Sequence, residues 1–179
     1  MFDFTTYTPE EVQLLLRVGR HHKTENLSDA QKKLLEIKDR IYLFDGIEAK
    51  DVGNMTRNVR FIRYKEGDTV MEQGDESDDI YFLLNGLIDV FVEHDEAQVP
   101  VGQIQHGALF GEMSFITGNP RSATMVTVSG EAMAIAFQMS ADEVDDSNAL
   151  DYAQLFHNIA HSVANKLEAC NERLLTGQS

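Results

Sequence analysis

The stretch FGEMSFITGNPRSATM, residues 110–125, sets one carboxylate and one guanidinium among glycine, proline and small residues. The glycine before Glu112 lets backbone N–H groups point outward, and a turn of helix over residues 113–116 would gather them into a nest that suits an anion. Arg121 adds a fork of N–H donors that matches phosphate oxygens in pairs. The stretch therefore predicts a site for a phosphate-like anion.

Glu112 narrows the kind of ligand, because a carboxylate beside a phosphate is repulsive. It fits a ligand that also offers a hydroxyl donor, such as a ribose, since a charge-assisted hydrogen bond of that kind contributes roughly 1.5–3 kcal/mol. Ser122 adds a further donor, and Ala123 leaves room for a ligand to approach. A phosphate at one end and a sugar hydroxyl at the other indicate a nucleotide. The competing interpretation is a structural salt bridge between Glu112 and Arg121 that closes a loop.

The sequence around this stretch is typical of a small β-structure. From Val59 onward, short runs of β-branched and aromatic residues alternate with Gly, Asp and Asn. Asn85-Gly86 is the strongest hairpin signal. Many short strands at this spacing favour a closed antiparallel barrel or jelly roll. We expect strands near residues 60–64, 69–72, 80–84, 87–92, 99–104, 123–128 and 132–138.

Helices are predicted on both sides of the strands. Capping boxes begin at Thr8, Ser28 and Ser140, and the helix opened by Ser28 is expected to continue to Phe44. A short amphipathic piece follows over residues 47–55, and a long helix runs from about residue 148 to Leu175. The predicted fold class is α+β, an antiparallel β jelly-roll barrel flanked by N-terminal helices and a long C-terminal helix. We divide the chain into an N-terminal helical extension, a barrel and C-terminal lid or dimerisation helices, at residues 1–44, 45–141 and 142–179.

The long helix carries an apolar stripe whose steps of three and four residues have the coiled-coil period. The stripe either forms a dimer seam or covers the barrel, and both uses are compatible because Ile159 and Ala164 broaden it. We expect a parallel homodimer through residues 150–174, with the cysteine of the stripe in a core. The stripe consists of Ala153, Phe156, Ala160, Val163, Leu167, Cys170 and Leu174.

Composition limits the class of partner. The 179 residues include 15 Lys and Arg against 30 Asp and Glu, a net charge of −15 that repels nucleic acid and anionic membranes. Cys170 is the one cysteine, which excludes an internal disulfide. The first residues lack the pattern of a signal peptide, and no apolar run reaches membrane-spanning length. We therefore expect a cytoplasmic protein that binds neither DNA nor a membrane.

The opening stretch resembles the phosphate-binding cassette of the cyclic nucleotide-binding domain family. Phe110-Gly111-Glu112, Pro120-Arg121 and Ser122-Ala123-Thr124 stand at the family's spacing, and the likeness covers about residues 43–170. An ordered set of matches at fixed intervals is far more specific than a lone glycine motif. The upstream matches are Leu43-Phe44 with Ile47, Glu66-Gly67-Asp68, Gln73-Gly74-Asp75, Tyr81-Phe82 and Asn85-Gly86.

This resemblance implies a role for each residue of the segment. Glu112 would accept from the ribose 2′-hydroxyl, Arg121 would pair with the cyclic phosphate, and nearby backbone amides would surround that phosphate. The base would lie against the barrel under the helix that follows it, and that helix would move when ligand binds. The expected ligand is cAMP, with cGMP as the competitor. The predicted ligand-binding residues are Phe110, Gly111, Glu112, Met113, Ser114, Arg121, Ser122 and Ala123.

The chain is thus predicted to be a non-enzymatic regulatory module, with no cofactor or metal, that signals to an unknown protein partner. The main alternative is a degenerate cassette that serves as a ligand-free interaction scaffold. A metal-dependent enzyme on a related barrel is disfavoured, because His94 and His106 each stand alone. A transcription factor is disfavoured by the acidic charge and by the absence of a DNA-binding domain before Ser179.

Two side-chain clusters contain residue types that can bind a metal ion. His157 and His161 lie one helical turn apart, but the sequence places no third ligand beside them. The run from Asp75 to Asp79 lacks the alternating ligands and central glycine of a calcium loop. We expect this run to be a solvated turn.

Overall fold

The computed structural model describes residues 28–95, 97–139, 144–146 and 148–176. The helices predicted at the capping boxes of Thr8 and Ser140 lie outside these residues. The helical elements are α2 (Asp29–Ile37), η1 (Lys38–Arg40), η2 (Tyr42–Phe44), α3 (Ala49–Met55), α4 (Glu112–Thr117) and α5 (Ala149–Thr176). The strands are β1 (Thr56–Lys65), β2 (Thr69–Met71), β3 (Ile80–Asn85), β4 (Leu87–His94), β5 (Ala97–Gln105), β6 (Leu109–Phe110), β7 (Thr124–Thr127) and β8 (Glu131–Met139).

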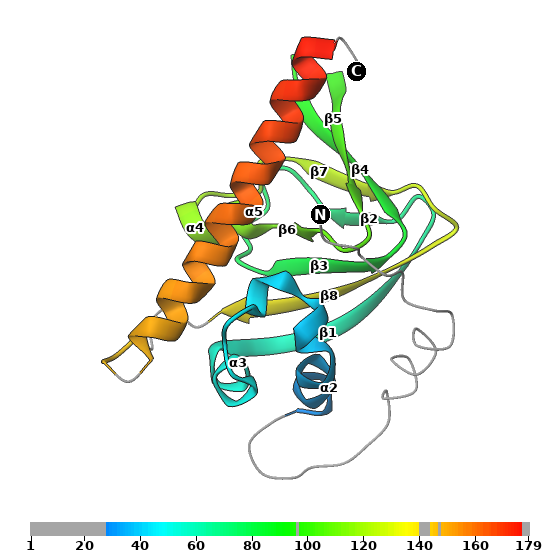
Figure 1. Ribbon diagram of the computed structural model, residues 1–179. Coiled ribbons are helices and arrows are strands. Elements are labelled where there is room, and N and C mark those ends of the chain that lie inside the picture. The colour runs from blue at the N-terminus through cyan, green and yellow to red at the C-terminus, as the bar shows by residue number, and fades with distance from the viewer. Residues whose placement is uncertain (1–27, 96, 140–143, 147, 177–179) are drawn as a thin grey trace.

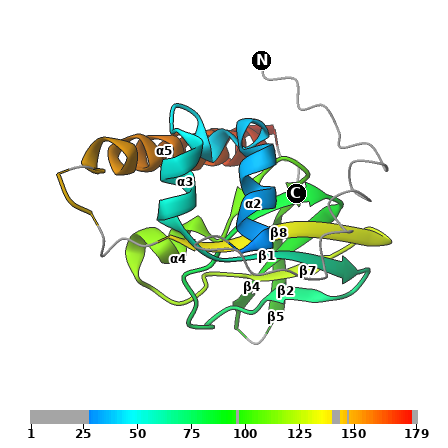
Figure 2. The ribbon, with the colours of Figure 1, turned by 90° about the horizontal axis from the view of Figure 1, so that it is seen from below.

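The strands form two antiparallel four-stranded sheets with the orders β1-β8-β3-β6 and β2-β7-β4-β5. Figure 2 shows α2, α3 and α5 on one side of the first sheet, with the second sheet on the other side. In Figure 1, α5 crosses the whole molecule as one long diagonal helix. The predicted α+β jelly-roll fold is confirmed.

Strand β8 separates two clusters of buried side chains. Successive side chains of a strand point to opposite faces. Met133, Ile135 and Phe137 therefore pack among the helices, while Ala132, Ala134 and Ala136 face the space between the two sheets. The large residues thus belong to the cluster under the helices, and the small residues belong to the cluster between the sheets.

The Asn85-Gly86 turn does not join a paired hairpin. β3 pairs with β6 and β8, whereas β4 pairs with β5 and β7, so this turn carries the chain from one sheet to the other. Gly86 has a φ of +99°, and a Cβ there would lie 2.5 Å from the Ala132 Cβ. The hairpin prediction was wrong because the close packing of the turn on β8 directs the two strands into different sheets.

The helix predicted to run from Ser28 to Phe44 ends early. Ser28 does form its capping box with Gln31, but α2 stops at Ile37 and gives way to the short turns η1 and η2. Ile41 between them is extended, with φ −111° and ψ 96°. This break lets the closely spaced Ile41, Leu43 and Phe44 all enter the core, which one continuous helix could not achieve.

Helix α5 spans nearly the predicted residues but covers the barrel with a different face. Tyr152, Leu155 and Ile159 are buried against the helical layer. The predicted stripe is exposed apart from Val163, which is partly buried. Cys170 is likewise exposed, so it does not lie in the core of this single chain. Phe156 is partly covered, because its ring stacks on Phe115 of α4 with the centroids 5.9 Å apart. The remainder of the apolar stripe beyond Val163 faces outward.

Candidate functional site

The predicted binding segment forms a tight corner between β6 and α4. Gly111 has a left-handed φ of +78° and immediately precedes Glu112, the first residue of α4. A Cβ on Gly111 would lie 2.8 Å from Arg121 Nη1 and 2.9 Å from the Asp79 carbonyl oxygen. The corner needs glycine both for its backbone angle and for this close approach. The turn of helix that the sequence predicts over residues 113–116 is present.

Arg121 is buried at this corner, with 3% of its surface exposed. Nη1 donates to the Gly111 carbonyl at 2.8 Å, and Nη2 donates to the Asp79 carbonyl at 2.7 Å and to Ser77 Oγ at 3.0 Å. All three acceptors are neutral. The Nε–H is buried and has no partner, and no ion pair among the described residues includes this guanidinium.

The backbone of Arg121 is held by the loop that follows β2. Its N–H donates to the Asp75 carbonyl at 2.9 Å, and its carbonyl accepts from the Gly74 N–H at 2.8 Å. The run from Asp75 to Asp79 is therefore more than a solvated turn, because it supplies partners to both the main chain and the side chain of Arg121. Asp79 itself is buried, pairs with Arg60 through Oδ2, and leaves Oδ1 without a partner.

An aromatic pair lies beneath the guanidinium. The rings of Tyr81 and Phe110 are stacked with centroids 5.0 Å apart, and the Arg121 guanidinium carbon lies 5.7 Å from the Tyr81 ring centroid. Burial raises the pKa of the Tyr81 hydroxyl above its ordinary value, and the nearby Asp79 carboxylate raises it further. Tyr81 therefore remains protonated and neutral beneath the guanidinium at physiological pH.

Glu112 is also buried, but its partner comes from a distant part of the chain. Its Oε1 accepts from Lys166 Nζ on α5 at 2.6 Å, and only 4% of the Glu112 side chain is exposed. Lys166 was not among the site residues predicted from the sequence. In the sequence Lys166 is one lysine on a predicted helix, and lysines are too common on surface helices to indicate a partner.

The structure contains no salt bridge between Glu112 and Arg121 among the described ion pairs, so their loop-closing pair is not present. Glu112 follows Gly111 in the chain and binds Lys166, whereas Arg121 donates to the Gly111 carbonyl. Of the other predicted site residues, Phe110, Ser114 and Ala123 are buried, whereas Met113 and Ser122 are exposed. Their contacts with a ligand stay predictions.

Two further properties bear on the class of protein. Within the described ranges, no group of three or more His, Cys, Asp or Glu side chains is placed to hold a metal ion. In the same part of the chain, no helix has the length and apolar character needed to cross a membrane.

Comparison with known proteins identifies the family. Residues 61–145 match the cyclic nucleotide-binding domain. The type II regulatory subunit of cAMP-dependent protein kinase from Drosophila melanogaster is 30% identical over 105 residues, which cover 59% of this chain and 24% of that protein. The regulatory subunit of the Dictyostelium discoideum kinase is 31% identical over 104 residues, covering 55% and 30%. The matched regions thus make up less than a third of each relative. Residues 61–145 of this chain thus form a region of the cyclic nucleotide-binding domain family.

Solved structures support the fold. A cyclic nucleotide-binding domain from Methylobacillus flagellatus aligns with a TM-score of 0.65 at 18% identity, covering 89% of this chain and 98% of that one. The catabolite activator protein of Thermus thermophilus aligns with a TM-score of 0.56 at 24% identity, covering 74% and 61%. At these identities the likeness concerns the fold alone.

Proposed function

We propose that this chain is a cyclic-nucleotide-sensing regulatory module that binds cAMP at the β6–α4 corner and signals through α5 to a protein partner. It acts by binding, without catalysis. The names of the two relatives, both regulatory subunits of cAMP-dependent protein kinase, favour cAMP over cGMP as the ligand.

The observation that carries this proposal is the unpaired charge of Arg121. A buried cation is ordinarily compensated by an anion, because neutral acceptors replace only part of its lost hydration. Among the residues that the structure describes, the guanidinium has only neutral acceptors and an unused Nε–H donor. A cyclic phosphate supplies both the missing negative charge and an acceptor for that donor.

Two other features suit the rest of the nucleotide. The interior wall of β8 consists of Ala132, Ala134 and Ala136, which take up little of the space between the sheets. Glu112 lies next to the phosphate corner and is acceptor-only when ionised. Its carboxylate can accept from the ribose 2′-hydroxyl, the role that the family resemblance implies for Glu112.

The Lys166–Glu112 pair suggests how binding reaches α5. A ribose hydroxyl that donates to Glu112 competes with Lys166 for the same carboxylate. This competition weakens the ion pair that holds α5 to the binding corner. The ligand thereby favours one position of the helix over another. Figure 1 shows that α5 extends well beyond α4, so a change at Lys166 affects the long C-terminal part of the helix.

A thermal-shift panel tests the proposed ligand. At a concentration 100 times its dissociation constant, cAMP is expected to stabilise the protein by about 2.7 kcal/mol. For a chain of this size that corresponds to a rise in Tm of roughly 5–10 °C. We expect a smaller shift with cGMP, and a smaller one with 2′-deoxy-cAMP because Glu112 then lacks its donor. No shift with any cyclic nucleotide would favour the ligand-free scaffold instead.

We also propose that the module is a homodimer through residues 150–174. The support is the outward apolar stripe of α5, where Phe156, Leu167 and Leu174 are 42%, 61% and 76% exposed. An exposed stripe with the coiled-coil period is the pattern expected of a helix that packs against a second copy.

Leu167→Glu tests the dimer, because it places a charge at the middle of the stripe. We expect the molar mass from light scattering to halve, while the far-UV circular dichroism stays unchanged. Leu175→Glu is the matched control, since Leu175 is 87% exposed, lies just beyond residues 150–174 and is about 80° round the helix from Leu167. A monomeric wild type, or equal loss of mass in both variants, would contradict the assignment.

A further inference from the structure

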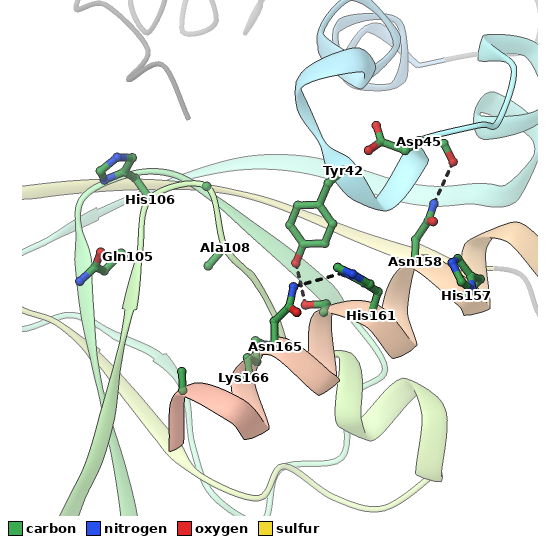
Figure 3. Close-up of a pocket in the computed structure, with 13 residues that line it drawn as sticks. Tyr42, Asp45, Gln105, His106, Ala108, His157, Asn158, His161, Asn165 and Lys166 are labelled. Carbon is green, nitrogen blue, oxygen red and sulfur yellow. Dashed lines mark hydrogen bonds between the residues drawn. The ribbon is translucent and has the colours of Figure 1, made fainter. Parts of the chain in front are cut away.

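A pocket lies between α5, the β5–β6 turn and η2. Its volume is about 570 Å³, within the range of small-molecule sites. Figure 3 shows Tyr42 of η2 pointing at α5, with His161, Asn165 and Lys166 along the helix. None of the predicted ligand-binding residues lines this pocket. The lining residues used below are Tyr42, Asp45, Asn158, His161, Asn165 and Lys166.

One end of this pocket has more hydrogen-bond donors than acceptors. Lys166 carries three N–H donors, and within the described part of the chain Glu112 is the one acceptor bonded to them. The Asn165 amide nitrogen lies 3.2 Å from His161 Nδ1. Because an amide nitrogen only donates, Nδ1 is the acceptor in this contact, and the neutral His161 ring carries its proton on Nε2.

The one carboxylate among the described residues that line the pocket, that of Asp45, belongs to its other end. Asn158 donates to the Leu43 and Asp45 carbonyls at 2.9 Å each, which fixes η2 on α5. Lys166 lies eight residues further along the helix, about 12 Å away at 1.5 Å per residue. The Asp45 carboxylate is thus separated from Lys166 by most of the pocket, and its repulsion of an anion there is weak.

We propose that this pocket is a second ligand site, for a small organic or inorganic oxyanion whose carboxylate or phosphate binds Lys166. This anion draws Lys166 away from Glu112, which frees Glu112 to accept the ribose hydroxyl. The pocket anion and the cyclic nucleotide therefore strengthen each other's binding. The coupling rests on the proposed cAMP site, whereas the anion site itself does not.

Binding of the anion is tested first without nucleotide. Citrate, inorganic phosphate and pyrophosphate are titrated at constant ionic strength, with chemical shifts of the α5 amides as the readout. We expect saturable shifts for at least one probe, centred on Asn165 and Lys166. Asn165→Asp adds a negative charge beside Lys166 and should weaken binding at least tenfold, whereas Asn171→Asp, the same change outside the pocket, should not.

Arg121→Lys distinguishes this site from the nucleotide corner. Anion binding that survives Arg121→Lys but is lost in Asn165→Asp supports the pocket. The reverse pattern means that the probe occupies the phosphate position of the barrel, and the pocket proposal is then overturned while the proposed cAMP site is strengthened. Absence of saturable binding by all three probes also overturns it.

The coupling is tested by measuring the cAMP dissociation constant with and without saturating probe. Allosteric coupling free energies typically change affinity by fivefold or more. We expect cAMP to bind about fivefold more tightly in the presence of the probe, and Lys166→Met to abolish this gain. Unchanged cAMP affinity in wild type overturns the coupling. Absence of cAMP binding altogether refutes the proposed function and removes the coupling, but leaves the anion site to be judged by its own titration.

Discussion

Arg121→Ala is expected to reduce cAMP affinity by about 2–5 kcal/mol, because the buried phosphate loses the charge that pairs with it. Isothermal titration calorimetry measures the loss directly. The variant also removes three hydrogen bonds to Gly111, Asp79 and Ser77, and a buried acceptor left unpaired costs about 1–3 kcal/mol. Lower stability of the unliganded protein is therefore part of the expected result.

Two controls separate loss of binding from loss of fold. Arg63→Ala removes an arginine from β1 whose side chain is 46% exposed and whose nearest carboxylate, on Glu131, is 3.9 Å away. It should leave cAMP affinity unchanged. Circular dichroism and the Tm of Arg121→Ala establish whether it is folded at the temperature of the titration. A folded Arg121→Ala with wild-type affinity would exclude Arg121 as the phosphate ligand.

Gly111→Ala is expected to cost about 2–5 kcal/mol of the free energy of unfolding. Alanine at a left-handed φ costs about 1–2 kcal/mol, and overpacking adds about 1–3 kcal/mol. The added Cβ would meet Arg121 Nη1 and the Asp79 carbonyl, neither of which can withdraw without breaking hydrogen bonds. The measurement is chemical denaturation of the unliganded protein, which does not depend on the identity of the ligand.

Gly118→Ala is the matched control for this substitution. Gly118 at the other end of α4 has a similar φ of +67°, but an added Cβ there would meet nothing within 4 Å. Only the backbone cost of about 1–2 kcal/mol is expected. Equal destabilisation by the two substitutions would show that the close packing at the corner does not depend on glycine.

The strands and the cassette were predictable because their signals are local. All seven expected strands are present, and only the two-residue β6 was missed, since two residues are too few for an alternating pattern. The Gly111 corner followed from the glycine beside an acid. The Asn85-Gly86 turn shows the limit of local signals, because its dipeptide specifies a turn but does not specify which strand the next segment joins.

The contacts between distant segments were not predictable from one sequence. Lys166 and Glu112 lie 54 residues apart, and nothing near either residue indicates the other. The same holds for Ser77 and Asp79, which bind Arg121 across the barrel. The stripe of α5 has the correct period for a helix, but periodicity cannot tell which apolar face meets the barrel and which faces outward. Tyr152, Leu155 and Ile159 form the buried face, in the cluster that the helices share with the first sheet.

The arrangement of β8 limits how information can travel through this molecule. Strand β8 separates the two buried clusters, with alanines on the face between the sheets and Met133, Ile135 and Phe137 on the face toward the helices. It is bonded to a neighbour along both edges, so it has little freedom to bulge or slide. A signal from the space between the sheets is therefore expected to reach the helices through the Glu112–Lys166 ion pair, and not through β8.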